Sequence, residues 1–215
     1  MGQSINTTGL LLTYNKNWPS KWYNEHNYTH IIYEDMLIRE YVSSALKKLD
    51  FFYSKCIIKR SINNISVHIN IYNKKRKLNK ENKSLTIKKD ILLEINNTLV
   101  KLTGNQIKLF FRFTNNFDAQ ILAQYIAKKI ETRISFQNIF NKIIVKLKRV
   151  KGINKIKGLR LQCSGRPNGN DMASIQWFKH GQTPLHTYNS KIDYCYTTAL
   201  TKYGICGIKV WISFI

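Results

Sequence analysis

The sequence predicts a fold of the α/β (α+β) class, in which a small α/β unit precedes an antiparallel sheet packed on helices. Stretches with apolar residues at helical spacing are interspersed with short runs that alternate apolar and polar residues, and strand-like runs end the chain. The chain has 215 residues, of which 43% are hydrophobic, so it can bury a core as one large domain or two small ones. No apolar run approaches the roughly 18 residues of a membrane-spanning helix.

The first half supplies the elements of the small unit. Residues 1–20 mix glycine and proline with polar residues, and we expect them to form an extended arm. Residues 34–49 place apolar side chains at helical spacing, with acids at the start and lysines at the end, as the helix dipole favours. Strand-like runs follow at 56–62 and 65–72, and His68 belongs to the polar face of the second. We expect His68 to be a surface residue rather than a ligand.

The unit continues through a polar and basic loop at 73–84 and a helix at 86–102 that is closed by Gly104. A strand at 106–113 completes it, which gives the order β-β-α-β after a first helix.

Residues 117–149 form the longest periodic stretch, and they predict either one long helix or two helices broken near Ser135. The apolar stripe consists of Ile121, Leu122, Tyr125, Ile126, Ile130, Ile134, Ile139, Ile143 and Leu147. Strands are expected after it at about 158–164, 173–180, 191–201 and 204–213. Their short turns favour an antiparallel sheet with helices on one face, and we expect Trp177, Phe178 and Trp211 to fill its core.

The charge is strongly positive and uneven. The formal net charge is +23, and residues 55–151 alone hold 22 basic and five acidic side chains. Residues 1–54 are neutral, with five of each sign, and residues 152–215 hold eight basic and two acidic side chains. Such an excess calls for a polyanion, so nucleic acid is the first candidate partner and an anionic membrane surface the second.

Several basic residues are candidates for contacts to phosphate. Arg166 lies in a glycine-bounded turn, where it contacts phosphate or remains a solvated surface arginine. Lys142, Lys146 and Arg149 fall at i, i+4 and i+7 on one helical face and favour a phosphate-facing ridge over a merely solvated one. His186 is presented by a proline-bounded loop and anchors either the backbone or RNA. The remaining candidates for RNA contacts are Lys179, Lys191, Lys74, Lys75, Arg76 and Lys77.

The cysteines predict no metal site. None of the four forms a C-x-x-C pair, and no Cys/His cluster has zinc-finger spacing. We expect reduced and mostly packed thiols, as in a reducing compartment. No catalytic residue and no cofactor are expected.

Three classes of function are compatible with this basic composition, and each needs different residues. A structural RNA-binding protein needs only scattered lysine and arginine. A free-standing RNA-binding or RNA-processing factor needs a clamp of its own. A metal-dependent nuclease needs clustered carboxylates, and residues 152–215 offer only Asp171 and Asp193. Membrane binding is disfavoured, because the stripe in 117–149 is better explained as the face that covers the sheet.

Both ends of the chain carry specific short motifs. Those towards the carboxy terminus are S-G-R at 164–166, Gly169, Trp177, Gly181, P-L-H-T at 184–187, I-D-Y at 192–194 and T-K-Y-G-I-C-G-I-K-V-W-I at 201–212. Those at the start are M-G-Q at 1–3, Gly9, Leu12, Trp18, Ser20, Trp22 and I-R-E-Y at 38–41. In these motifs, and in the order of its elements, the chain resembles the ribosomal protein S3 family over essentially its whole length.

The resemblance implies a domain plan and a role. The plan is an arm at 1–20, a KH-like domain of the prokaryotic type at 21–114 and a ribosomal S3-like α/β domain at 115–215. The role is a structural constituent of the small-subunit head that binds rRNA, neighbours ribosomal proteins S10 and S14 and lines the side where mRNA enters. A free-standing KH-like factor is the alternative, and neither a membrane partner nor a homo-oligomer is expected.

The chain departs from the family pattern in its amino-terminal arm, where Asn6, Thr7 and Leu11 replace the usual His-Pro and Arg, and at two places further along. The GxxG loop with which a KH domain grips the RNA backbone is missing, because residues 74–86 read KKRKLNKENKSLT instead. The basic F-R-R-x-x-K-R-like pattern on the helix that faces the mRNA channel is replaced by Gln137, Asn138 and Asn141, with Lys142 retained. We therefore expect RNA contacts through lysine charges and a passive lining of the channel.

The composition also bears on origin. Ile, Lys and Asn number 29, 27 and 22, and all three have A/T-rich codons. Together with a start that lacks a recognisable presequence, this favours a mitochondrial gene product, with a plastid or an AT-rich bacterium as the alternatives.

Overall fold

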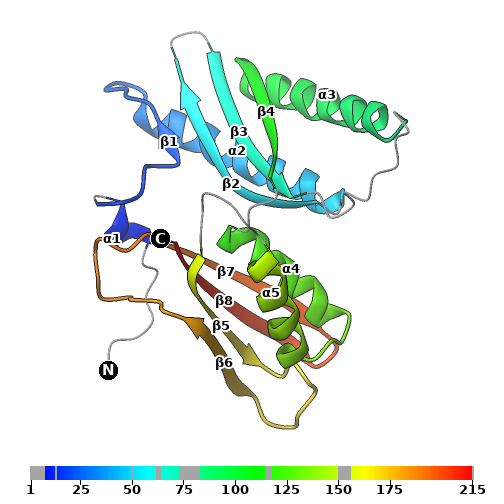
Figure 1. Ribbon diagram of the computed structural model, residues 1–215. Coiled ribbons are helices and arrows are strands. Elements are labelled where there is room, and N and C mark those ends of the chain that lie inside the picture. The colour runs from blue at the N-terminus through cyan, green and yellow to red at the C-terminus, as the bar shows by residue number, and fades with distance from the viewer. Residues whose placement is uncertain are drawn as a thin grey trace. The chain divides into compact units, whose positions relative to one another are not determined.

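The computed structural model describes residues 8–12, 14–49, 51–61, 64–72, 83–114, 118–149 and 156–214, with the backbone alone for 83–91, 113–114 and 148–149. The fold is mixed α/β, as predicted. The chain divides into two compact units (Figure 1), the first made of Trp18–Asn115 and the second of Met1–Asn17 together with Asn116–Ile215.

The first unit is a four-stranded sheet with two helices. Its elements are β1 (Ser20–Lys21), α2 (Tyr28–Lys48), β2 (Phe52–Arg60), β3 (Asn64–Tyr72), α3 (Lys83–Thr103) and β4 (Gln106–Thr114). The strand order is β1-β2-β3-β4, in which β2 and β3 form an antiparallel hairpin and the outer pairs are parallel. Parallel neighbours need a crossover, and α2 and α3 provide it.

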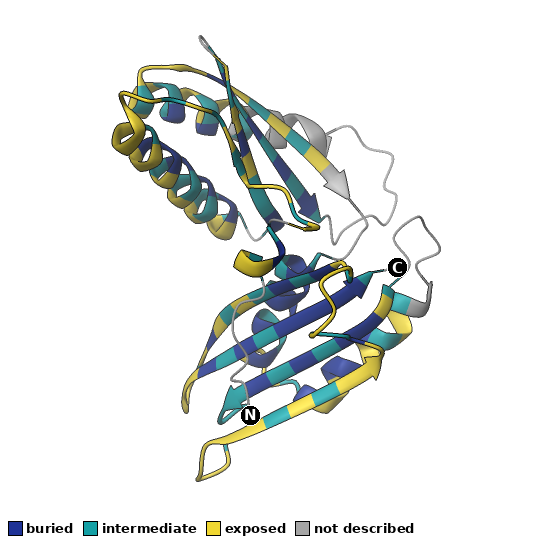
Figure 2. Ribbon diagram, turned by 90° about the vertical axis from the view of Figure 1, so that its left-hand side faces the viewer, coloured by how far each residue is buried: buried dark blue, intermediate teal, exposed yellow. Residues whose placement is uncertain are grey.

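Both helices cover the same face of this sheet. Along β3 every second residue is buried, from Ile65 to Ile71 (Figure 2), and these side chains pack with Ile38 of α2 and Leu99 of α3. The opposite face of β3 carries its polar residues, including His68. The alternation therefore fixes which face the helices cover.

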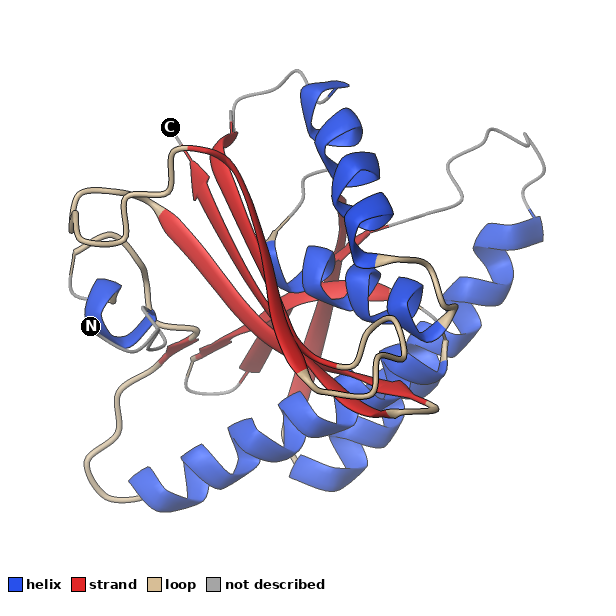
Figure 3. Cartoon of the chain, turned by 90° about the horizontal axis from the view of Figure 1, so that it is seen from below, coloured by secondary structure: helices blue, strands red, loops and turns tan. Residues whose placement is uncertain are grey.

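The second unit has a sheet of the order β6-β5-β8-β7, in which every neighbouring pair is antiparallel. Its elements are α1 (Thr8–Leu11), α4 (Ala119–Glu131), α5 (Phe136–Arg149), β5 (Ile156–Gly165), β6 (Ser174–Gly181), β7 (Ile192–Thr201) and β8 (Gly204–Phe214). The strands are drawn red in Figure 3, with α4 and α5 along one face. None of the helices in the described part of the chain is long and apolar enough to cross a membrane.

The helical stretch predicted at 117–149 is two helices rather than one. They are separated at the predicted place, and Arg133 in the turn has a φ of 60°, which a continuous helix cannot contain. Phe136 and Phe140 of α5 lie 5.3 and 5.0 Å from the ring of Phe178 on β6, measured between ring centroids. This aromatic cluster fastens α5 to the sheet.

Two expectations need correction. The arm is not wholly extended, because Thr8–Leu11 form the helical turn α1, whose Leu11 packs against Tyr194 and Trp211. Trp177 is 58% exposed and does not belong to the core. Neighbouring residues of a strand point to opposite faces, so Phe178 faces the helices and Trp177 faces away from them. Trp211 is buried as predicted, at 1% exposure.

Candidate nucleic-acid interface

The outer face of α5 presents the predicted lysine ridge. Lys142 and Lys146 are exposed along one edge of the buried face of the helix, which carries Ile139 and Ile143. The ammonium of Lys146 donates a hydrogen bond of 3.2 Å to the hydroxyl of Tyr125 and lies 4.5 Å from the centre of that ring. The neighbouring helix α4 therefore holds this charge in place. Arg149, the third member, is described in its backbone only.

The amides that replace the family's basic residues are on the surface. Gln137, Asn138 and Asn141 are all exposed on α5. Arg133, which is not among the predicted contacts, is also exposed, in the turn just before this helix. The start of α5 therefore presents uncharged amides with one cation before them and Lys142 after them.

Arg166 is partly engaged by its own loop. Its Nε donates to the carbonyl oxygen of Asn170, its guanidinium lies 5.6 Å from the ring centre of Tyr203, and Asp171 is 3.9 Å away. Gly169 has a φ of 81°, and a Cβ there would lie 2.7 Å from the Tyr203 ring. The close packing of this loop on Tyr203 thus requires glycine, and it leaves the Arg166 side chain 33% exposed.

His186 and Lys191 lie in the connection between β6 and β7 and are both exposed. Ser190 shapes this loop, because its single O–H lies within hydrogen-bonding reach of the carbonyl oxygens of Thr187, at 2.6 Å, and Pro184, at 3.0 Å. Lys179 is exposed near the end of β6. It pairs with Arg160 near the start of β5, so it lies at the end of the sheet from which the β6–β7 connection leaves.

The predicted residues do not form one patch. Arg166 follows the end of β5, where β6 begins and the β7–β8 turn lies, whereas His186 and Lys191 lie at the opposite end of the sheet. Lys142 and Lys146 belong to the helical layer on one face. Lys74, Lys75, Arg76 and Lys77 lie outside the described residues. The candidate contacts are therefore distributed, as suits a partner that surrounds much of a protein.

Sequence reasoning missed an arginine on the face of the second sheet that lies opposite α4 and α5. The guanidinium of Arg160 lies 5.2 Å from the ring centre of Trp211 and 5.6 Å from that of Trp177. The strand pairing explains the contact, because Arg160 is the register partner of Trp211 and a near neighbour of Trp177. The alternation of β5 was a usable signal, since Leu159 and Leu161 on either side of Arg160 are buried.

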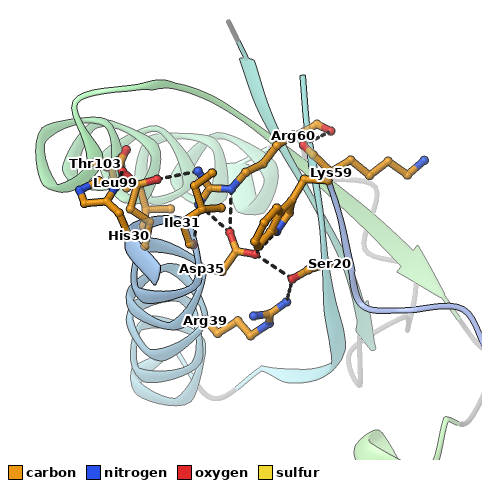
Figure 4. Close-up of polar contacts among 12 residues, drawn as sticks. Ser20, His30, Ile31, Asp35, Arg39, Lys59, Arg60, Leu99 and Thr103 are labelled. Carbon is orange, nitrogen blue, oxygen red and sulfur yellow. Dashed lines mark hydrogen bonds and ion pairs between the residues drawn. The ribbon is translucent and has the colours of Figure 1, made fainter. Parts of the chain in front are cut away.

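Three acidic side chains bind partners inside the protein, while Glu25, Glu40, Glu94, Glu131 and Asp171 are exposed. Asp193 accepts a hydrogen bond of 2.9 Å from the backbone N–H of Ala119 at the start of α4, and it lies 3.4 Å from the Lys16 ammonium. In the first unit, Glu34 and Asp35 are buried and bound by Arg60 (Figure 4). Carboxylates that neutralise internal donors do not offset the outward cations.

Asp35 is the centre of a network that joins three elements of the first unit. Its Oδ2 accepts hydrogen bonds from the Ser20 hydroxyl at 2.7 Å and from the Trp22 indole N–H at 2.9 Å. Its Oδ1 accepts from Arg60, and Arg39 donates to the Ser20 hydroxyl (Figure 4). The short strand β1 is thereby tied to α2 and β2.

The thiols are free, and two of them are strongly perturbed. Burial raises the pKa of Cys163 to about 12, with the neighbouring Cys206 contributing in the same direction, and burial raises the pKa of Cys56 to about 11. A raised pKa keeps a thiol neutral and poorly reactive at physiological pH. Among the described residues, no group of three or more His, Cys, Asp or Glu side chains is placed to hold a metal ion.

Two α/β units with exposed lysines on both, in a chain of 35 Lys and Arg against 12 Asp and Glu, are typical of a basic nucleic-acid-binding protein. Residues 126–212 match the family model described as "Ribosomal protein S3, C-terminal domain". The chain is 33% identical over 213 residues to the "Small ribosomal subunit protein uS3" of Lactobacillus johnsonii, covering 99% of this chain and 91% of that one. Proteins of the same name from Anaeromyxobacter dehalogenans and Ehrlichia chaffeensis are 34% and 33% identical, cover 99% of this chain, and are themselves covered to 90% and 95%. The chain belongs to the uS3 family, which confirms the family resemblance of the motifs at its two ends.

Proposed function

We propose that this chain is a structural constituent of the small ribosomal subunit that binds rRNA. The observation that carries the proposal is the match to small-subunit proteins over 99% of the chain, combined with a net charge of +23. A free-standing RNA-binding factor is not favoured, since the chain spans nearly the whole length of relatives that are named as subunit proteins.

The distribution of cations supports binding to a large polyanion. Lys142 and Lys146 on α5, Arg166 after β5, and Lys179, His186 and Lys191 near the other end of the sheet present separate contacts rather than one cleft. Each phosphate neutralised releases counterions and adds a salt-dependent increment of affinity. A folded RNA that contacts several faces of the protein can use all of these residues together.

The proposal assigns the two units to the domain plan of the family. Residues 21–114 form a KH-like domain without the GxxG clamp, and residues 115–215 form the ribosomal S3-like domain, preceded by the arm at 1–20. Ribosomal proteins S10 and S14 are the proposed protein neighbours in the subunit head. The excess of Ile, Lys and Asn, whose codons are A/T-rich, favours a mitochondrial ribosome, with a plastid or an AT-rich bacterium as the alternatives.

We further infer that α5 lines the path by which mRNA enters, and that it does so passively. The supporting observation is the exposure of Gln137, Asn138 and Asn141 on a helix whose apolar face is buried. Amides can donate hydrogen bonds to phosphate but carry no charge, so they hold single-stranded RNA more weakly than arginine or lysine.

RNA crosslinking tests the proposed function. An affinity-tagged chain is irradiated in cells, purified under denaturing conditions, and the attached RNA is sequenced. The proposal predicts that small-subunit rRNA dominates, with crosslinks clustered at a few positions. A dispersed set of mRNAs or tRNAs, with rRNA at background level, would instead support a free-standing factor.

A further inference from the structure

The open face of the first sheet combines cations and rings in adjacent rows. The register places Lys21, Lys59 and Lys108 in one row across the sheet, with Ser66 of β3 between the last two. Directly paired residues point to the same face. The three lysines are exposed, and their face is the one that α2 and α3 leave uncovered.

The next row on this face is apolar and aromatic. It consists of Ile57, His68 and Phe110, which are paired across β2, β3 and β4. The rings of His68 and Phe110 are stacked, with centroids 4.9 Å apart and planes inclined by 13°. Phe110 is 49% and Ile57 is 37% exposed. The sheet's own packing therefore leaves Phe110 about half exposed beside the partly buried His68.

One side of the Phe110 ring has no strand beside it in the described part of the chain, because β4 is the last strand in the sheet order. A planar ligand can therefore continue the stack begun by His68 and Phe110. Arg112, exposed on β4, lies two residues beyond Phe110 on the same face. The aromatic row is thus flanked by lysines on one side and by an arginine on the other.

The charge of this face selects among planar ligands. The strands β1, β2, β3 and β4 contain no aspartate or glutamate. The nearby buried acids Glu34 and Asp35 belong to α2, on the covered side, and are bound by Arg60. A surface with aromatic side chains and positive charge fits a single-stranded nucleic acid, whose bases stack while its phosphates meet the cations.

We propose that the open face of the first sheet, around Phe110, His68, Lys59 and Lys108, binds single-stranded RNA by base stacking. In this chain the surface takes the place of the missing GxxG loop as an RNA contact. A GxxG loop grips the RNA backbone, whereas here the lysines contact phosphates and the aromatic rings stack on bases. The inference rests on the proposed function, since it names a second kind of RNA contact within the ribosome.

The test measures binding of the full chain to a fluorescent single-stranded RNA of about ten nucleotides, a length typical of such sites. Phe110→Leu removes the stacking ring and keeps an apolar side chain. Its matched control is Tyr33→Leu, which removes an exposed ring from α2. Loss of one stacked base should weaken binding by about 5- to 150-fold in the first variant and leave the second unchanged.

A second pair of variants tests the charges. Lys59→Gln with Lys108→Gln removes two cations from the open face, whereas Lys47→Gln with Lys101→Gln removes two exposed cations from α2 and α3. The first pair should lower the slope of log affinity against log salt by about 1.4, because each phosphate contact to a single strand contributes about 0.7. Equal slopes for the two pairs, or unchanged binding by Phe110→Leu, would overturn the inference.

Crosslinking of the wild-type chain in assembled subunits separates this inference from the proposed function. If the wild-type chain fails to join small subunits, the proposed function fails. If it joins them and ultraviolet light crosslinks the Phe110 peptide to RNA, the inference is supported. If that peptide crosslinks to a neighbouring protein instead, the open face is a protein-docking surface and the inference is wrong while the proposed function stands.

Discussion

Arg60 donates two hydrogen bonds to one oxygen of Asp35, from Nε at 2.9 Å and from Nη2 at 2.6 Å. A third bond of 2.5 Å joins its Nη1 to Glu34. The side chains of Asp35 and Arg60 are 3% and 10% exposed. The pair fastens the end of β2 to α2, so it is a structural centre of the first unit rather than a place for a ligand.

Removing one partner of this pair should strongly destabilise the first unit. Arg60→Met leaves Glu34 and Asp35 buried without their cation, and we expect a loss of about 3–5 kcal/mol in the free energy of unfolding. Lys47→Met makes the same change of charge on the exposed end of α2 and should cost less than about 0.5 kcal/mol. Urea titration of the full chain in high salt, followed by circular dichroism, measures both. Equal midpoints for the two variants would refute this role for Arg60.

The arm should stabilise the second unit through one leucine. Leu11 is 4% exposed and contacts Ile192, Tyr194 and Trp211, so Leu11→Ala should cost about 2–4 kcal/mol. The adjacent Leu10 is 55% exposed, and Leu10→Ala should cost less than about 0.5 kcal/mol. The same urea titration compares them. If both variants unfold like the wild type, the arm does not pack on this sheet in solution.

The raised thiol pKa values predict slow and pH-dependent alkylation. A pKa of about 12 for Cys163 and about 11 for Cys56 leaves roughly one thiolate in ten thousand and one in a thousand at pH 8. Alkylation by iodoacetamide, followed by peptide mass spectrometry, should therefore be slowest at Cys163 and should rise about tenfold per pH unit. In urea all four cysteines should react alike. Rapid labelling of Cys163 in the folded chain at pH 8 would contradict its burial.

The sequence predicts the helices and strands well, but it predicts less well which face of a sheet each side chain occupies. The break between α4 and α5 and the strands of the second sheet were predictable, because hydrophobic periodicity and glycine mark them locally. Trp177 was assigned to the core wrongly, because a Trp-Phe pair in a strand must place its rings on opposite faces and only the packing of α5 decides which is covered. The turn α1 was missed because four residues carry no periodic signal, and tertiary contacts of Leu11 stabilise it.

The sequence predicts which residue types contact RNA, but it does not predict which of these residues lie close to one another. The exposure of Lys142 and Lys146 follows from the helical stripe, whereas the separation of Arg166 from His186 depends on the strand order of the sheet. The stack of His68 on Phe110 depends on a parallel register between strands that are 42 residues apart along the chain. No local pattern specifies such a register.

Charge removal at the ridge should weaken assembly. Lys146→Gln abolishes a cation that Tyr125 holds in place, and it should reduce incorporation into subunits most at low salt, because a phosphate contact contributes most to affinity there. Lys146→Arg keeps the charge and should restore incorporation. Incorporation is measured by quantitative mass spectrometry of gradient-purified subunits. If the Gln variant incorporates like the wild type at every salt concentration, Lys146 makes no contact to rRNA.

Restoring charge on α5 should strengthen its hold on mRNA. Gln137→Arg with Asn138→Arg adds two exposed cations, and translation through a structured mRNA by reconstituted subunits should become faster. Each added contact should raise the salt slope for single-stranded RNA at this place by about 0.7. Lys142→Gln is the opposite change and should slow the same reaction. If the native subunit already unwinds as well as the restored one, the lining is not passive.

As a structural constituent, this chain should be a permanent resident of the small ribosomal subunit. The most direct test is sucrose-gradient sedimentation of the tagged chain after a wash in high salt, which strips loosely bound factors. We predict that the chain remains in the small-subunit peak in a ratio of about one to one with its rRNA, as a structural constituent requires. Release of the chain to the top of the gradient, with intact small subunits left behind, would contradict the account.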